Sequence, residues 1–236
     1  MWIVLVGLIV LYVFLVWWLS DKRRYTMARD LPLRMPQQTG ALPERFDWRE
    51  HNMQFDVPDA GSCGACYIYA ALIPFQLRNR LPPLSASYLL RCQAYCSPGV
   101  CDDGCDGGLV DHTWLFLLEH GVPPANADAL DCDAQPPHRA RDVYKLPPDV
   151  DAIKTEILQN GPVSAGMTAH EDFVAFTGSG VYHHDPASAL VGGHAVVLLG
   201  WGPGYWIGLN SWGAGWGDGG FFKIDFTIQD DVVAGH

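Results

Sequence analysis

The chain has 236 residues, enough for one or two compact domains with a hydrophobic core. Its formal net charge of −11 and isoelectric point near 5.0 disfavour a nucleic-acid-binding role, because phosphate binding needs clustered lysine and arginine. The 25 glycines, 17 prolines and 9 tryptophans indicate a loop-rich fold rather than a helical bundle.

Residues 1–19 carry no charge and are almost wholly apolar. At about 1.5 Å per residue such a helix would span about 28 Å, close to the thickness of a bilayer core. A cleaved signal peptide would have a basic start, a shorter apolar stretch and small residues before the cut, and the sequence lacks all three. We therefore predict a transmembrane anchor over residues 1–20, in contact with the lipid bilayer, and a tether over residues 21–41.

Two signals disagree about the side of the membrane on which the domain lies. Lys22, Arg23 and Arg24 follow the apolar run, which favours the cytosol for the rest of the chain. The seven cysteines are typical of an oxidising compartment. We give the cysteines more weight and predict a lumenal or extracellular domain.

The soluble part begins near Leu42, and its first half is predicted to be helical. Four helices are expected, at Cys66–Leu72 (which Pro74 stops or kinks), Ser85–Leu90, Leu109–His120 and Asp151–Gln159. After Pro162, glycine-rich turns separate short runs that predict antiparallel strands at Val163–Met167, Ala195–Leu199, Tyr205–Leu209 and Phe221–Ile224. This order predicts an α+β fold with its functional site between the two halves.

The stretch DAGSCGACY, residues 59–67, contains two cysteines that fit several kinds of site. An odd number of cysteines leaves one thiol unpaired in an oxidising compartment. Cys66 opens a predicted helix, where the helix dipole favours a thiolate. The alternatives are a buried inert thiol, a redox dithiol of Cys63 and Cys66, and a zinc site that adds Cys101 and Cys105.

A base that could activate Cys66 is present in the second half of the chain. His194 lies in GGHAVVLLGWG, at the mouth of a predicted buried strand. Asn210, in GLNSWGAGWG, would lie on the far arm of a hairpin, where its amide oxygen would accept a hydrogen bond from the imidazole. Trp212 would shield that bond from water. Each residue alone is more often structural, but together they favour a nucleophile, a base and an orienting group.

These motifs resemble the papain-like cysteine proteases and, among them, cathepsin B most closely. CGACY fits the signature Cys-Gly-[Ser/Ala]-Cys-[Trp/Tyr], with histidine and asparagine about 130–150 residues downstream. LPERFDWRE, GCDGG, NGPVSAGM, GVYHHDP, NSWGAGWGDGGFFKI and VVAG follow in the family's order. The resemblance implies a papain-like two-lobed fold over residues 42–236. A helical lobe would occupy roughly residues 60–150 and a β-barrel-like lobe roughly residues 151–230, with the active site in the cleft between them.

The resemblance also implies roles for individual residues. Cys66 matches the nucleophile, His194 the general base and acid, and Asn210 the residue that orients the imidazole. The implied activity is hydrolysis of peptide bonds through a thioester acyl-enzyme, on a peptide or protein substrate, with no cofactor and no metal. Other positions expected beside the substrate are Gly107 and Gly108, which would bind its backbone as an added strand, and Gly193 and Trp212.

The remaining six cysteines match disulfide pairs of the family. The implied pairs are Cys63–Cys105, Cys92–Cys132 and Cys96–Cys101. This assignment leaves Cys66 unpaired, as a thiolate nucleophile requires.

The sequence departs from the family pattern in several places. The backbone N–H of Cys66 would be one donor of the oxyanion hole, but the usual side-chain donor, a glutamine, is replaced by Ala60. Tyr67 replaces the usual tryptophan. The segment between the predicted anchor and Leu42 is shorter than the family's inhibitory prosegment. Ala60 is the main feature that keeps a second function open, a weakly active or inactive homologue that serves as a membrane-anchored binding or structural protein.

One further departure and one match concern substrate choice. The region that forms a long occluding loop in cathepsin B is short here, and His138 is its only histidine. We therefore expect an open cleft and endopeptidase activity. Asp231 matches an acid in a specificity pocket of cathepsin B and would allow an arginine to bind there; a solvated C-terminal aspartate is the alternative.

Overall fold

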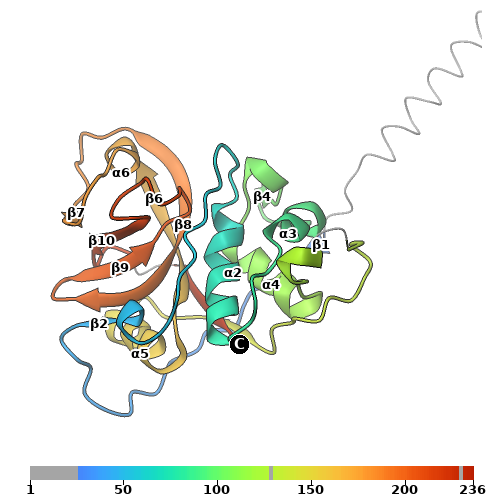
Figure 1. Ribbon diagram of the computed structural model, residues 1–236, viewed down its shortest axis with the longest axis horizontal. Helices are drawn as coiled ribbons and strands as arrows, with labels where there is room; N and C mark the ends of the chain where they lie inside the picture. Colours follow the sequence, from blue (N-terminus) through green and yellow to red (C-terminus); the bar gives the residue numbers. More distant parts are fainter. Residues whose placement is uncertain (1–25, 128–129, 229–230) are drawn as a thin grey trace, which may run out of the picture.

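The computed structural model describes residues 26–127, 130–228 and 231–236, which form an α+β structure of two lobes (Figure 1). The α+β fold class expected from the sequence is thereby confirmed. The predicted anchor, residues 1–20, lies outside the described residues. Within the described part of the chain, no helix combines the length and apolar character that crossing a membrane requires.

The first lobe is mainly helical. Its α-helices are α2 (Cys66–Arg78), α3 (Ala86–Cys92) and α4 (Val110–Glu119), and its short 3-10 turns are η2 (Gly104–Asp106) and η3 (Ala125–Ala127). A small sheet in the order β1-β3-β4 (Thr26–Met27, Tyr95–Ser97 and Val100–Cys101) lies beside them. The core between α2, α3 and α4 contains large buried aromatic side chains, among them Tyr67, Phe75, Tyr88 and Trp114.

Helix α2 continues past Pro74, although the sequence predicts that this proline stops or kinks it. Proline has no N–H, so the carbonyl of Ala70, four residues earlier, loses its helical donor. The Ser164 hydroxyl donates a hydrogen bond to that carbonyl at 2.6 Å, and Trp114 Nε1 donates to Ser164 Oγ at 2.8 Å. A donor from the other lobe therefore compensates for the proline.

The second lobe is built on an eight-stranded sheet. Its path is β5-β11-β6-β8-β9-β10-β7, with β2 paired to β8. The strands are β2 (Phe46–Asp47), β5 (Val143–Lys145), β6 (Val163–His170), β7 (Val181–Tyr182), β8 (Leu190–Gly202), β9 (Tyr205–Leu209), β10 (Phe221–Asp225) and β11 (Val232–Gly235). The path runs from β5 to β7 without closing on itself in the described residues, so this lobe is a curved open sheet rather than a closed barrel.

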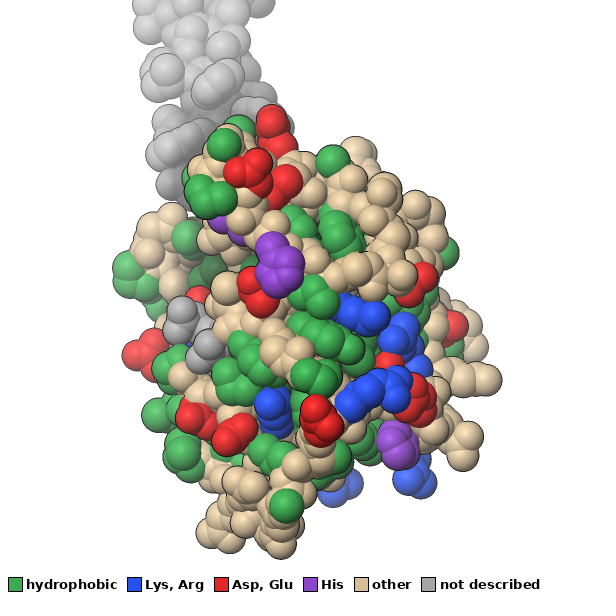
Figure 2. Space-filling model, turned by 90° about the vertical axis from the view of Figure 1, so that its left-hand side faces the viewer, with side chains coloured by type: hydrophobic (Ala, Val, Ile, Leu, Met, Phe, Trp, Pro, Cys, Tyr) green, Lys and Arg blue, Asp and Glu red, His purple; other side chains and the backbone are tan. Residues whose placement is uncertain are grey.

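Two α-helices and a 3-10 turn cover this sheet. They are α5 (Val150–Asn160), α6 (Glu171–Val174) and η1 (Trp48–Glu50). Asp149 caps α5 by accepting a hydrogen bond from the N–H of Ala152 at 2.7 Å, and Ile153 and Ile157 are buried against the strands. Figure 2 shows one side of the molecule, on which hydrophobic, basic and acidic side chains are interspersed.

A buried ion pair joins the lobes behind the cleft. Arg78 at the end of α2 pairs with Glu156 of α5, and both side chains are almost completely buried. Arg78 also donates a hydrogen bond to the carbonyl of Gly235 in β11 at 3.1 Å. The end of the first long helix is thus bound to both a helix and the last strand of the second lobe.

Part of the segment predicted as a tether packs on the domain. Thr26 and Met27 pair with β3, and Leu31 is buried in the core of the helical lobe. Leu33 bridges to Lys145 of β5. The described residues before Leu42 are therefore in contact with the domain and add to both of its sheets.

Candidate active site

Cys66 lies at the N-terminal end of α2, facing the sheet of the other lobe. Its side chain is partly buried, and burial raises the pKa of the thiol. Backbone N–H groups of Ala195 and Tyr67 favour the thiolate and oppose this rise only in part. The first turn of a 13-residue helix favours negative charge at this position as well.

His194 lies on β8 and is held by a residue from the neighbouring segment. Its Nε2 donates a hydrogen bond to Asn210 Oδ1 at 2.8 Å, and the two residues are 8% and 1% exposed. The ring of Trp212 stacks on the imidazole at 4.5 Å between centroids. Burial lowers the pKa of His194, while the bond to Asn210 opposes that shift. The imidazole is therefore oriented by a neutral amide and keeps its second nitrogen free of that bond.

One cavity of about 820 Å³ brings the candidate residues of the two lobes together. Cys66, Gly107 and Gly108 line it from the helical lobe, and Gly193 and His194 line it from β8. Asp231 also lines it, just before β11. Asn210 and Trp212 are not lining residues, since they lie behind the histidine.

All seven cysteines lie in the described residues, and six form the pairs that the family resemblance implies. The disulfides are Cys63–Cys105, Cys92–Cys132 and Cys96–Cys101. Cys66 is the free one. The redox-dithiol and zinc alternatives are wrong, because Cys63, Cys101 and Cys105 are each bonded to another cysteine.

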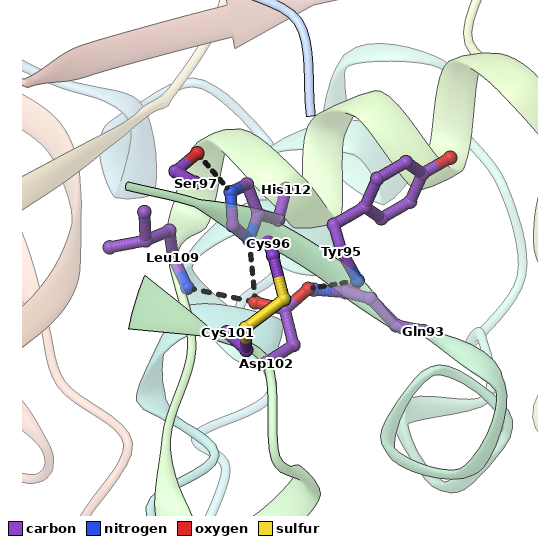
Figure 3. The surroundings of a disulfide bond; sticks show 8 residues. All are labelled: Gln93, Tyr95, Cys96, Ser97, Cys101, Asp102, Leu109 and His112. Carbon is purple, nitrogen blue, oxygen red and sulfur yellow. Dashed lines mark hydrogen bonds and ion pairs between the residues drawn. A yellow bond between two sulfur atoms is a disulfide. The ribbon is translucent and has the colours of Figure 1, made fainter. Parts of the chain in front are cut away.

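A buried carboxylate fixes the loop that carries Gly107 and Gly108 (Figure 3). Asp102 Oδ1 accepts hydrogen bonds from the N–H of Leu109 at 3.2 Å and from His112 Nδ1 at 2.8 Å. Its other oxygen, Oδ2, accepts from Gln93 Nε2 and from the N–H of Tyr95. Ser97 Oγ lies 2.8 Å from His112 Nε2.

Glycine is required in this loop for two different reasons. Gly107 has a φ of 117°, a conformation that L side chains rarely adopt. A Cβ on Gly108 would come within 2.6 Å of Asp102 Oδ1 and would clash with the Tyr67 ring. The two glycines therefore keep their backbone close to the helix that begins with Cys66.

Nearby backbone donors are largely occupied. The N–H of Ala60 donates to the carbonyl of Ser211 at 2.9 Å, and that of Cys63 donates to the carbonyl of Ala60 at 3.0 Å. The N–H of Gly61 donates to Asp59 Oδ1, and that of Gly64 donates to the carbonyl of Cys105. Since alanine has no side-chain donor, position 60 offers none to the cavity.

Comparison with known proteins identifies the family of this arrangement. The family model described as "Papain family cysteine protease" matches residues 42–233. The chain belongs to the papain family of cysteine proteases. The matched residues include Cys66, His194 and Asn210.

Curated relatives carry cathepsin B-like names. The chain is 31% identical to "Cathepsin B-like protease 1" of Arabidopsis thaliana over 74% of this chain. It spans only 56% of the length of that relative. It is 27% identical to "Cathepsin B-like cysteine proteinase 5" of Caenorhabditis elegans, over 92% of this chain and 81% of that protein.

Solved structures share the papain-like fold. Procathepsin B S9 from Trypanosoma congolense aligns with a TM-score of 0.75 and 25% identity, over 88% of this chain and 82% of that one. The Carica candamarcensis cysteine protease CMS1MS2, solved in complex with E-64, aligns with a TM-score of 0.67 and 23% identity. That alignment covers 82% of this chain and 98% of the Carica chain, and shows the fold alone.

Several cavity residues carry no signal in the sequence. Lys145 lies 2.5 Å from Asp111 and 3.7 Å from Asp231, so the predicted pocket acid Asp231 has a cation beside it. The rings of His170 and His184 stack at 3.8 Å, and both line the cavity. These residues come from segments that only the fold brings together. In the described part of the chain, no group of side chains is arranged to hold a metal ion.

Proposed function

We propose that the protein is a cysteine endopeptidase in which Cys66 is the nucleophile, His194 the general base and acid, and Asn210 the orienting residue. The observation that carries the proposal is that His194, held by a 2.8 Å hydrogen bond to Asn210, lines the same cavity as Cys66. A structural histidine would have no need of a free thiol across a cavity. Substrates would be peptides or proteins.

The first chemical step would transfer an acyl group to the sulfur. His194 takes the proton of Cys66, and the thiolate attacks the carbonyl carbon of the scissile bond. The resulting tetrahedral intermediate collapses as His194 gives the proton to the leaving nitrogen. The C–N bond breaks, an amine departs and a thioester remains.

The second step would release the acid. A water molecule loses a proton to His194 and attacks the thioester carbonyl, and the C–S bond breaks to regenerate Cys66. Asn210 holds one tautomer and one ring orientation throughout, because its carbonyl oxygen accepts from Nε2. No cofactor and no metal takes part in this scheme.

Burial favours the neutral forms of both groups when each is considered alone. It raises the pKa of Cys66 and lowers that of His194. Proton transfer between them creates opposite charges together, and their attraction offsets the desolvation of each. The reactive thiolate–imidazolium form therefore depends on Cys66 and His194 together.

The oxyanion hole is the weak part of the site. The N–H of Cys66 would be one donor at the start of α2, and Ala60 supplies no second one. Loss of one such donor costs about 10²–10³ in rate. We infer that the site reacts with alkylating agents but turns over peptides slowly.

Labelling with a thiol-directed epoxide tests the nucleophile. The wild-type protein should acquire one label, located at Cys66 by mass spectrometry, and Cys66→Ser should acquire none. Label on another cysteine, or equal labelling of the variant, would contradict the assignment.

The endopeptidase assignment can be tested by comparing peptides with blocked and with free termini. The region predicted to be short, residues 121–146, should leave the cleft open at that end. A peptide blocked at both termini should be cut at least as fast as the same peptide with free ends. Strict release of dipeptides from a free C-terminus would contradict endopeptidase activity.

A second candidate function is an inactive homologue that binds peptides or proteins, and Ala60 is the observation in its favour. A folded protein that binds peptides in the cavity but does not cleave them, even after Ala60→Gln, would support it. The intact Cys66, His194 and Asn210 favour the enzyme.

Membrane attachment through residues 1–19 is a separate proposal that rests on the sequence of that apolar run. Carbonate extraction should leave the full-length chain in the membrane fraction. Protease protection of the C-terminus in sealed vesicles tests the proposed lumenal or extracellular side, which the three disulfides favour.

A further inference from the structure

Three charged side chains form a cluster in the wall of the cavity. Lys145 Nζ lies 2.5 Å from Asp111 Oδ2 and 3.7 Å from Asp231 Oδ1. Each of the three lines the cavity that also contains Cys66 and His194. A substrate that reaches the cysteine therefore shares this cavity with these three charged side chains and with Asp106.

The fold fixes the position of each member. Asp111 lies in the first turn of α4, and Lys145 ends β5, whose register with β11 pairs it with Val233. The backbone N–H of Lys145 also donates to the carbonyl of Pro32 at 2.9 Å. Asp231 packs over Gly166 of β6, where an added Cβ would come within 3.3 Å of the Asp231 Cβ.

Lys145 is charged at neutral pH. Burial acts to lower the pKa of its amine, but the ion pairs with Asp111 and then Asp231 outweigh burial and raise it. The Lys145 and Asp111 side chains are 33% and 26% exposed, whereas Asp231 is 75% exposed. The close pair is thus partly shielded from solvent, and the Asp231 carboxylate faces water with Lys145 at its side.

This arrangement limits what Asp231 can do for a substrate. The sequence predicts that Asp231 allows an arginine to bind. An incoming guanidinium would share that carboxylate with Lys145 and would lie close to a like charge, which is unfavourable at such distances. An incoming carboxylate would meet Asp111 and Asp231. Apolar side chains, among them Val110, Met167 and Ile228, line the same cavity.

We propose that Lys145 is a specificity-determining residue that excludes basic side chains from this part of the cavity and favours an uncharged, apolar one. The inference rests on the proposed peptidase function, since it concerns the substrate of that site. Without Lys145 the carboxylates of Asp111 and Asp231 would have lost the cation that pairs with them, and this part of the cavity would favour arginine.

Paired peptides test the proposal. Each pair carries leucine or arginine at one of the three positions before the cleaved bond and is otherwise identical. The ratio of kcat/KM for arginine to that for leucine should rise about 30-fold or more in Lys145→Met, at one position only. The ratio should stay low in the wild type. When Asp231→Asn is combined with Lys145→Met, the ratio should rise less than in Lys145→Met alone. Lys154→Met is the matched control: it also removes one positive charge but lies on α5, outside the lining residues, and should leave the ratio unchanged.

A second measurement separates this inference from the proposed function. Protection of Cys66 from iodoacetamide reports peptide binding without turnover. If no peptide is cleaved but Lys145→Met shifts protection towards the arginine peptide, the inference holds and the peptidase assignment fails. If peptides are cleaved or protect but the ratio does not change in a folded Lys145→Met or Lys145→Gln variant, the inference is overturned. Absence of protection by either peptide also overturns it, because no peptide then occupies the cavity.

Discussion

Two buried histidines of this chain have similar geometry and different surroundings. His194 in the sheet lobe bonds a neutral amide, Asn210, and lines the cavity. His112 in the helical lobe lies between a carboxylate, Asp102, and the hydroxyl of Ser97, and it does not line the cavity.

The difference shows why hydrogen-bond geometry alone does not identify a catalytic residue. A Ser-His-Asp set with 2.8 Å contacts matches the pattern of a hydrolase, yet His112 is 1% exposed and Asp102 is fully occupied by four donors. His194 has fewer partners and an open side. We interpret His112 as a group that holds a loop and His194 as a group that transfers a proton.

The largest expected effect is that of His194→Ala. Without the imidazole, burial still outweighs the nearby backbone N–H groups and keeps the pKa of Cys66 above its usual value near 8.5. Alkylation of Cys66 near pH 7 should fall by about 10²-fold or more, and peptide turnover should fall at least as far. The alkylation rate of the variant should rise about tenfold per pH unit up to that raised pKa. Rates measured from pH 5 to 10 test this, and a wild-type profile in the variant would show that His194 does not act on Cys66.

The next effect in size is that of Ala60→Gln. The substitution adds a side-chain donor where the backbone N–H already bonds Ser211. We expect kcat/KM for a peptide to rise at least about tenfold, within the 10²–10³ attributed to one donor. The alkylation rate should stay nearly constant, because alkylation builds no oxyanion. Unchanged turnover in a folded, labelable variant would mean that another group already completes the hole.

A smaller effect is expected for His112→Leu. The variant leaves the Asp102 carboxylate buried with one partner fewer, which should lower the free energy of unfolding by about 2–3 kcal/mol. Urea denaturation measures this, and His120→Leu, at the exposed end of α4, should change it by less than about 0.5 kcal/mol. KM should rise several-fold as the Leu109 bond loosens, while alkylation of Cys66 stays the same. Loss of alkylation in a folded His112→Leu protein would assign it a catalytic role.

The smallest expected effect is on the loss of stability at acidic pH, and it involves a third histidine, His236. Burial, reinforced by Arg78, lowers the pKa of His236, as burial lowers that of His194. At pH values between the lowered pKa in the folded state and the pKa near 6.5 in the unfolded state, the unfolded chain binds more protons than the folded chain. The contribution of these histidines to the free energy of unfolding is therefore fully present above about pH 6.5 and is lost as the pH falls. His236→Gln should reduce the difference in unfolding free energy between pH 5 and pH 7.5, by no more than about 1 kcal/mol because the side chain is partly exposed. An equal pH dependence in variant and wild type would remove His236 from this account.

Local patterns predict the regular elements well. The run at residues 109–120 becomes α4, and Tyr205–Leu209 is β9 with unchanged bounds. Strands β5 and β11 are missed because VYK and VVAG are short and mostly buried, so neither shows the alternation of a half-exposed strand. The end of α2 is missed because the donor that offsets Pro74 comes from Ser164, a distant residue.

Some residues of the candidate site can likewise be predicted from local sequence motifs, and others cannot. Cys66, His194 and Asn210 are predicted from motifs, since their order and spacing resemble those of the family. Lys145 is not, because its position beside Asp231 depends on the register of β5 with β11. The roles of Asp102 and His112 depend on a loop conformation that residue spacing does not encode.

The contact of Arg78 with Glu156 and Gly235 has a consequence for the order of assembly. Strand β11 lies between β5 and β6, and all four of its residues are buried. On the ribosome, the helix that begins with Cys66 emerges long before residues 232–235. Until those residues are made, Arg78 lacks one of its carbonyl partners and the sheet beneath the histidine has a gap between β5 and β6. Nascent chains stalled before Val232 should therefore lack a complete cleft, so the proposed nucleophile meets its proposed base only after almost the whole domain has been synthesised.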